Sequence, residues 1–232
     1  MRMILLRHGE TGRNAENRFQ GQSDIPLNEA GVRQAERVAR SLDPARWTAV
    51  YSSTLDRAVR TAEPIAENLR VPHFRFEALR ERDLGELDGL DRAAYARRYP
   101  ARMRRLLTDP FYAPEGGETG AAARSRFSQG LRRIAEVTRD DPARPVLVVT
   151  HGGVLHLLAR WILGEHDTRR DMIGNCRAAA LDVEWSADGA LRADLLRWNV
   201  EAYECEGPAP AQGSPRIALP LMPAIPIPRG AA

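Results

Sequence analysis

The chain has 232 residues, of which 43% are hydrophobic and 28% are charged, and its formal net charge at pH 7 is only +3. This length is sufficient for one large domain or two small ones with an ample core, and the composition is that of an ordinary globular protein. The near-neutral charge gives a poor electrostatic footprint for a nucleic-acid-binding protein. All the basic side chains are arginine, whose planar guanidinium suits phosphate and carboxylate groups, so anionic ligands are easily accommodated.

The cysteines and the apolar runs bear on the compartment in which the protein works. The two cysteines, Cys176 and Cys205, fit neither a disulfide framework nor the spacing of zinc ligands. No segment approaches the roughly 18 apolar residues of a membrane span. The first residues lead directly into a strand-like run rather than into a signal peptide. We therefore expect a cytoplasmic protein that has no membrane partner.

Strand-like and helical patterns alternate along most of the chain. Strands are expected at 3–8, 48–53, 72–81 and 144–151, followed by a hairpin of 177–185 and 191–198. Helices are expected at 28–42, 54–69, 92–107, 120–139 and 153–163. Asn28 is suited to cap the first of these helices, whereas Pro64 should kink or shorten the second. The alternation predicts a layered α/β domain with a partly parallel sheet, which the hairpin makes mixed.

From Gly207 onward the sequence is rich in proline and has no periodic apolar face. Such a segment cannot form a packed helix or a central strand, so we expect it to be extended or disordered. The predicted organisation is therefore one domain over residues 1–206 and a proline-rich tail over residues 207–232.

Polar residues gather where the predicted strands end. The first strand ends in Arg7 and His8, and the apolar run "LVVTHGG" ends another strand at His151. The run "VYSSTLDR" places Arg57 in the first turn of the helix that follows its strand, and Glu81 stands at the end of a further strand. Because ligands bind beyond the carboxyl ends of the strands in open α/β sheets, we expect these side chains to converge.

The residue types at these strand ends suit phosphoryl chemistry. Two arginines and two histidines around one point form a cationic receptor for a phosphoryl group. One histidine could attack phosphorus and form a phosphohistidine, and adjacent positive charge should keep that imidazole unprotonated. A bound phosphate dianion favours the protonated form of a nearby carboxyl, so Glu81 could supply the proton that a leaving alkoxide needs. Fixed cations of this kind make a metal ion unnecessary, and we expect no metal and no cofactor.

Five motifs carry a resemblance to a known family: "LLRHGETGRN", "RFQGQSDIPLNEAG", "YSSTLDRAVRTAE", "LRERDLGELDG" and "VVTHGGVL". In this order, over about residues 3–163, they resemble the histidine phosphatase superfamily, the phosphoglycerate mutase-like proteins. The resemblance implies a three-layer α/β/α sandwich with a mixed, mostly parallel central sheet.

The same resemblance implies roles for individual residues. His8 would accept the phosphoryl group and Glu81 would be the general acid. The resemblance places further residues around these two, namely Arg7, Arg57 and His151 in the phosphate pocket, Asn14, Gln20 and Gly21 bordering the substrate, and Gly152 beside His151. Asp88 stands where many relatives have glutamate, which affects the local loop alone. Three histidines match no family motif and are expected to be structural or at the surface: His73, His156 and His166.

The superfamily contains phosphatases and mutases, and this sequence favours a phosphatase. Mutases of the family carry asparagine after the second His-Gly pair and an extended segment after the acid loop, whereas this chain has Gly153 and a compact segment. A cofactor-dependent phosphoglycerate mutase is the alternative. A non-catalytic module that binds phosphorylated ligands is the alternative from another class, although both His8 and Glu81 are retained.

The substrate is a small phosphate monoester whose leaving group the sequence leaves open. The lid, at about residues 82–120, contains aromatic and apolar residues that could accept a sugar, a nucleoside or an aryl group. Relatives in the family act on sugar phosphates, phosphoglycerates or α-ribazole phosphate. The arginines within 97–105 spread around a helix rather than forming one stripe, so no nucleic-acid partner is expected. The sequence does not decide between a monomer and a homodimer.

Overall fold

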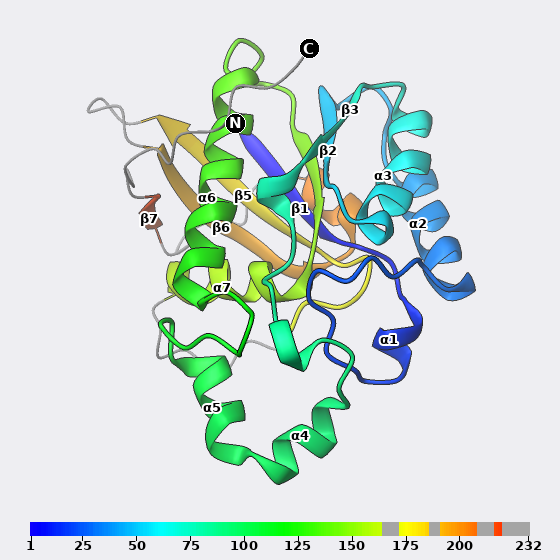
Figure 1. Ribbon diagram of the computed structural model, residues 1–232. Helices are drawn as coiled ribbons and strands as arrows, with labels where there is room; N and C mark the ends of the chain where they lie inside the picture. The colour runs from blue at the N-terminus through cyan, green and yellow to red at the C-terminus, as the bar shows by residue number, and fades with distance from the viewer. Residues whose placement is uncertain (164–171, 186–190, 208–215, 220–232) are drawn as a thin grey trace, which may run out of the picture.

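The computed structural model describes residues 1–163, 172–185, 191–207 and 216–219 (Figure 1). Its centre is a seven-stranded sheet in the order β3-β2-β4-β1-β5-β6-β7. The strands are β1 (Arg2–Arg7), β2 (Ala49–Ser53), β3 (His73–Phe76), β4 (Val146–Thr150), β5 (Ala178–Trp185), β6 (Leu191–Val200) and β7 (Arg216–Leu219). The helices are α1 (Gly12–Ala15), α2 (Glu29–Ser41), α3 (Asp56–Leu69), α4 (Arg92–Arg98), α5 (Pro100–Thr108), α6 (Gly120–Val137) and α7 (Gly152–Leu163).

The sheet has a parallel half and an antiparallel half. Strands β1 to β4 pair in parallel, whereas β5 pairs antiparallel with both β1 and β6, and β7 pairs antiparallel with β6. Strands β1 to β4 and β6 therefore run in one direction, and β5 and β7 run in the other. The predicted mixed and mostly parallel sheet is confirmed in that five of the seven strands share one direction, and the hairpin pairing of β5 with β6 is confirmed too.

Alternate side chains of β1 enter two different cores, as the two-residue repeat of a strand requires. Met3 and Leu5 pack in the core that α6 and α7 cover, and Ile4 and Leu6 pack in the core that α2 and α3 cover. Helices thus lie on both faces of the sheet, with α2 and α3 together on one of them (Figure 1). The three-layer α/β/α sandwich is confirmed.

Three elements differ from their predicted extents. The strand expected at 72–81 ends at Phe76, and a 3₁₀ helix, Glu77–Leu79, follows it. The helix expected at 92–107 is divided into α4 and α5 at Tyr99, because a residue before proline is disfavoured in the helical conformation and Pro100 starts a new helix. Helix α3 continues past Pro64 to Leu69. The buried side chains Ile65 and Leu69 stabilise this last part of α3 by packing on the sheet.

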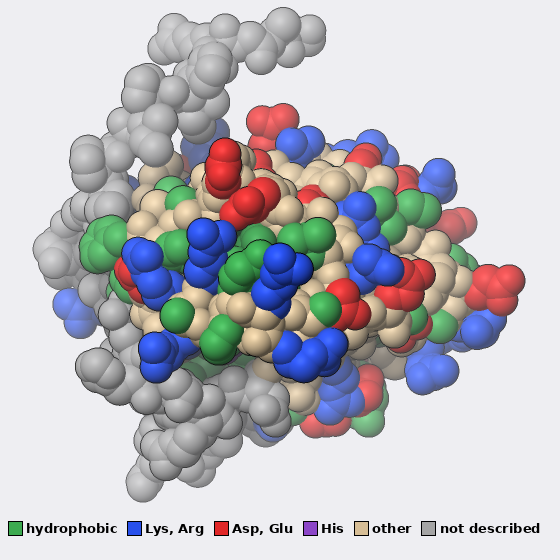
Figure 2. Space-filling view, turned by 60° about the horizontal axis from the view of Figure 1, so that its bottom comes forward, with side chains coloured by type: hydrophobic (Ala, Val, Ile, Leu, Met, Phe, Trp, Pro, Cys, Tyr) green, Lys and Arg blue, Asp and Glu red, His purple; other side chains and the backbone are tan. Residues whose placement is uncertain are grey.

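Helices α4 and α5 and the loops around them form a small lid with its own core. Phe19, Leu87, Tyr95 and Leu106 are buried together in this lid core. The lid lies beyond the carboxyl end of β1, where Figure 1 shows α4 and α5 below the sheet. The exposed arginines of α4 and α5 spread over the lid surface among hydrophobic side chains, as expected from the sequence (Figure 2).

Part of the expected tail contributes to the sheet. Residues 216–219 form the edge strand β7, which pairs with β6, so these residues are extended rather than disordered. The predicted boundary after residue 206 stays a prediction, and the rest of the tail lies outside the described residues. Within the part of the chain that the structure describes, no helix is both long and apolar enough to cross a membrane.

Candidate active site

Strand β1 delivers Arg7 and His8 to the site at the point where it leaves the sheet. The backbone N–H of His8 donates to the carbonyl of Thr150 at 2.9 Å, so the ends of β1 and β4 stay side by side. Gly9 then lets the chain pass close to α2, because a Cβ atom at Gly9 would lie 2.6 Å from the carbonyl oxygen of Gly31. The backbone thus fixes where the His8 side chain begins.

The imidazole of His8 has a defined orientation. Its Nδ1 lies 2.6 Å from the carbonyl oxygen of Gly9, and because a carbonyl can only accept, Nδ1 carries the hydrogen. In the neutral ring the lone pair is therefore on Nε2. Burial lowers the pKa of His8 well below its ordinary value of 6.5, and the positive charges of Arg57 and Arg7 lower it further. His8 is thus a neutral imidazole at neutral pH, with Nε2 able to act as a nucleophile.

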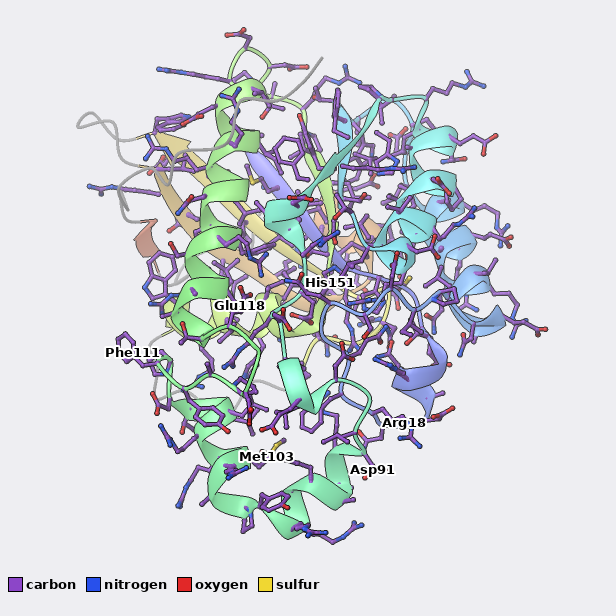
Figure 3. The ribbon with its side chains drawn as sticks, in the orientation of Figure 1. Arg18, Asp91, Met103, Phe111, Glu118 and His151 are labelled. Carbon is purple, nitrogen blue, oxygen red and sulfur yellow. The ribbon has the colours of Figure 1, made fainter. Side chains whose placement is uncertain are left out.

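His151 lies next to His8 at the end of β4. The two ring centroids are 5.1 Å apart, and the side chain of His151 is fully buried. Neither ring nitrogen of His151 has a hydrogen-bond partner. Burial lowers the pKa of His151 well below 6.5, and the positive charge of Arg57 lowers it further. Figure 3 shows His151 at the end of the sheet that faces α4 and α5, the part of the chain that carries Asp91 and Met103.

Arg57 is a fully buried cation in the first turn of α3, as predicted. Its Nη1 donates to the carbonyl of Ser23 at 2.8 Å and its Nη2 to that of Gly21 at 2.7 Å, while its Nε has no partner. Burial lowers the pKa of Arg57 to about 10, against the opposing charges of Glu81 and Asp24. Arg57 therefore stays charged at neutral pH. Gly21 supports Arg57 through its carbonyl and does not line the cavity.

The guanidinium of Arg7 is held by the segment that precedes β5. Its Nη1 donates to the carbonyl of Ile173 at 2.7 Å, while its Nε has no partner. Gly152 packs against it, since a Cβ atom at Gly152 would lie 3.2 Å from the Nε of Arg7. Burial lowers the pKa of Arg7, and the charge of Glu81 opposes this change. The predicted neighbour of His151, Gly152, thus makes room for an arginine.

The carboxylate of Glu81 rests on the first turn of α7. Its oxygens accept hydrogen bonds from the backbone N–H groups of Gly153 at 2.7 Å, Val154 at 2.9 Å and Arg82 at 2.8 Å. The start of a helix supplies free N–H donors and positive dipole charge, so it binds a carboxylate well. A Cβ atom at Gly153 would lie 2.5 Å from Oε1 of Glu81, so this arrangement requires glycine at position 153.

Amide side chains join the loop after β1 to the loop before β5. Asn175 Nδ2 donates to the carbonyl of His8 at 3.0 Å and to Oδ1 of Asn14 at 3.1 Å. The hydroxyl of Thr11 donates to Oε1 of Gln20 at 2.9 Å, and the Nε2 of Gln20 has no partner. Asn14 and Gln20 thus lie where the sequence places them. The sequence analysis missed Asn175, because no sequence motif marks it as part of the site.

One cavity contains most of the predicted residues, and its wall includes Arg7, His8, Asn14, Gln20, Glu81 and Gly152. Arg57 and His151 are close to His8 but stand behind this wall. Much of the cavity wall is apolar, with contributions from Phe19, Leu84, Leu106 and Leu107, from Leu157 of α7, and from Met172. Three cations and a histidine also line it, namely Arg18, Arg82, Arg92 and His156. The cavity therefore joins a polar floor to a more apolar outer part.

The remaining residues noted in the sequence lie around the site or away from it. His73 contacts the hydroxyl of Ser52 at 2.8 Å on the sheet, which agrees with a structural role, and His166 lies outside the described residues. His156 was expected to be structural or at the surface, yet it lines the cavity. Asp88 accepts hydrogen bonds from the backbone and hydroxyl of Ser23, the residue whose carbonyl holds Arg57.

The cysteines and the possible metal ligands add little to this site. Cys176 and Cys205 are both free and buried, and burial raises the pKa of each thiol to about 12. Neither thiol is therefore ionised at neutral pH. Among the described residues, no three side chains of histidine, cysteine, aspartate or glutamate are grouped so that they could hold a metal ion.

Comparison with known proteins agrees with this geometry. The model of a family described as histidine phosphatase superfamily (branch 1) matches residues 3–200. The chain is 36% identical to "Uncharacterized phosphatase PhoE" of Bacillus subtilis (strain 168), over 70% of this chain and 77% of that protein. It is 34% identical to "Probable phosphoglycerate mutase GpmB" of Proteus mirabilis (strain HI4320), over 82% and 89%. A solved structure of a mycobacterial glucosyl-3-phosphoglycerate phosphatase with VO3 is similar, with a TM-score of 0.77, 30% identity and coverage of 86% and 99%.

Proposed function

The chain belongs to the histidine phosphatase superfamily and is a phosphoric monoester hydrolase, and we propose that it hydrolyses small phosphorylated metabolites without a metal ion, through a phosphohistidine on His8. One observation carries this proposal. The Nδ1 of His8 donates to the carbonyl of Gly9, which leaves the Nε2 lone pair close to the buried Arg57 and the partly buried Arg7. A neutral imidazole within a cationic site has the protonation state that a nucleophile requires.

The proposed reaction has two displacements. In the first, Nε2 of His8 forms a bond to phosphorus, the bond to the ester oxygen breaks, and the carboxyl of Glu81 gives its proton to that oxygen. In the second, a water molecule attacks phosphorus and gives a proton back to Glu81, while the bond between nitrogen and phosphorus breaks. The products are the alcohol and inorganic phosphate, and both His8 and Glu81 return to their starting forms.

The cations Arg7 and Arg57 suit the charge that develops on the transferring phosphoryl group. Arg7 and Arg57 each keep an Nε without a partner, and each is anchored through other nitrogens to backbone carbonyls. Donors that are fixed before the reaction need no reorganisation when charge builds up, which makes them effective for catalysis. His151, whose ring centroid lies 5.1 Å from that of His8, would add a ring N–H close to this point. These groups support a mechanism in which protein cations do the work of a metal ion.

A mutase is the second candidate, because two relatives are named probable phosphoglycerate mutases. Position 153 favours hydrolysis. Mutases of the family carry asparagine there, whereas the first turn of α7 has room for no side chain beside Glu81. A phosphoglycerate mutase is therefore the less favoured reading. A module without catalysis is less favoured still, because His8 and Glu81 lie on the wall of one cavity.

The outer part of the cavity guides the choice of substrate. Its apolar side chains suit the carbon skeleton of a small metabolite, and Arg18 and Arg92 add positive charge to the wall of the cavity. The similar mycobacterial enzyme is named for a phosphorylated glycerate that carries a sugar. We therefore infer that sugar phosphates and phosphorylated hydroxy acids are the first substrates to test. A cytoplasmic location and the absence of nucleic-acid or membrane partners stay predictions.

Steady-state hydrolysis of p-nitrophenyl phosphate in excess EDTA tests the proposal. We expect wild-type turnover to survive the chelator and to fall by at least about 1,000-fold in His8→Ala, because the nucleophile is lost. His73→Ala is the matched control, since His73 lies on the sheet away from the site, and it should keep wild-type turnover. Loss of wild-type activity in EDTA, or equal activity in the two variants, would contradict the proposal.

A further inference from the structure

The backbone that carries Glu81 lacks the support of the sheet. Strand β3 ends at Phe76, and the chain then passes through the 3₁₀ helix Glu77–Leu79 into a loop without regular structure. Glu81 lies in this loop, and its carboxylate must nevertheless stay on the N–H groups of α7. Catalytic groups have to be held close to their productive geometry, since a displacement of about 1 Å can lower the rate about 100-fold. Some other group must therefore fix the loop.

Arg126 of α6 donates several hydrogen bonds to the segment that carries Glu81. Its Nη1 donates to the carbonyl oxygens of Ala78 at 3.0 Å and Arg80 at 2.9 Å. Its Nη2 donates to the carbonyl oxygen of Glu81 itself at 3.2 Å. One planar guanidinium thus contacts three carbonyls within four successive residues of the acid-bearing loop. A guanidinium presents several donors in a fixed fork, which an ammonium group does not.

Glu118 holds Arg126 in this position and also contacts the loop. Its carboxylate accepts from Nη2 of Arg126 at 2.5 Å. The backbone N–H of Glu118 donates to the carbonyl of Asp83 at 3.0 Å, and its carbonyl accepts from Nε of Arg82 at 3.1 Å. Arg126 and Glu118 therefore contact the chain on both sides of Glu81. Figure 3 shows Glu118 near the end of α6 that faces the lid.

We propose that Arg126, held by Glu118, is a positioning residue that keeps the general acid Glu81 on the first turn of α7. This inference rests on the proposed role of Glu81. Arg126 does not line the cavity, so it makes no contact there with a substrate and acts on Glu81 through the loop that it holds. Its positive charge also helps to lower the pKa of His151, and Arg126→Lys keeps that charge. The same contacts in a merely structural role would stabilise the fold but would not affect one chemical step more than another.

A double-mutant cycle separates these two roles. We would measure kcat/KM for phenyl phosphate and p-nitrophenyl phosphate in the wild type, Arg126→Met, Glu81→Ala and the double variant. The two esters are similar in shape, but phenolate is the poorer leaving group and depends more on the acid. We expect Arg126→Met to lower kcat/KM for phenyl phosphate by about 10- to 100-fold and that for p-nitrophenyl phosphate much less. In the Glu81→Ala background it should cause no further loss.

Controls make each outcome decisive. Arg133→Met, an exposed arginine on the same helix, should leave both kcat/KM values unchanged. Arg126→Lys keeps the charge but not the fork, should show a smaller loss with the same dependence on leaving group, and takes the place of Arg126→Met if that variant does not fold. Equal losses on both esters, or the same loss with and without Glu81, would overturn the inference. If Glu81→Ala itself slowed both esters equally, the proposed role of Glu81 would fail instead.

Discussion

Glycine at position 153 determines where the general acid can rest. The carboxylate of Glu81 occupies the space into which any side chain at position 153 would project. A Cβ atom there would lie 2.5 Å from the nearest carboxylate oxygen. The obstructing atoms are the end of a flexible side chain, so a larger residue would displace Glu81 rather than unfold α7. Glu81 can therefore keep its position only if residue 153 has no side chain.

We predict that Gly153→Ala will lower kcat/KM for phenyl phosphate by about 100-fold, because the displaced Glu81 no longer reaches the leaving oxygen. Its thermal unfolding should stay close to that of the wild type. Gly12→Ala is the matched control, because a Cβ atom at Gly12 would meet nothing within 4 Å. Wild-type kcat/KM in Gly153→Ala would show that Glu81 does not need its present position.

Individual site residues could be predicted where one side chain marks a strand end or a helix start. Arg7, His8, Arg57 and His151 are of this kind, and the structure brings them together. Asn175 and Arg126 could not be predicted in this way. Both residues donate to backbone carbonyls of distant segments, and no local sequence pattern reveals a contact of that kind.

The lid is an element that depends on one buried arginine. Arg82 has 5% of its surface exposed, and its guanidinium donates to the carbonyls of Leu106, Tyr112 and Glu118. These acceptors come from α5 and from the loop between α5 and α6. Arg82 therefore joins the lid to the loop that carries Glu81.

We predict that Arg82→Met will lower the free energy of unfolding by about 2–3 kcal/mol, since three hydrogen bonds from a charged donor are lost. Amide hydrogen exchange should become faster across residues 106–118, and KM should rise because the lid forms one wall of the cavity. Arg104→Met, at an exposed position on α5, should change none of these three quantities. If the two variants unfolded at the same denaturant concentration, Arg82 would not hold the lid.

Most helices and strands could be predicted from the pattern of apolar residues. The predictions were wrong at two prolines and at the short strand β3. The uninterrupted apolar run of β1 predicted a buried strand, and the alternation of strands with helices predicted a layered α/β domain. The three-layer sandwich was implied by the family resemblance. The break at Pro100 was missed, because the apolar pattern continues across it. Pro64 had the opposite outcome, since packing on the sheet keeps α3 helical.

At the scale of the whole molecule, two neutral histidines in the core make stability depend on pH. Burial lowers the pKa values of His8 and His151 well below 6.5, whereas the unfolded chain protonates these side chains near that pH. Below about pH 6.5 the unfolded state therefore binds more protons than the folded state. The stability that the neutral rings provide is complete above that pH and is lost as the pH falls.

We predict that the free energy of unfolding will fall between pH 7 and pH 5, by up to about 1.4 kcal/mol per pH unit for each of these histidines. Urea unfolding at the two pH values measures this change. In the double variant His8→Asn, His151→Asn the dependence on pH should be much weaker. An equally steep fall in that variant would assign the effect to other groups.

The molecule as a whole gathers its strand ends at one edge of the sheet and covers them with a lid, and the central claim is that phosphoryl transfer passes through His8. The most direct test is rapid quenching of the wild-type enzyme during turnover of p-nitrophenyl phosphate in alkaline denaturant, followed by mass spectrometry of the peptides. The account predicts one phosphoryl group on His8 that is formed and lost on the timescale of turnover. Product release while His8 stays unmodified at every quench time, or a phosphoryl group on another residue, would contradict it.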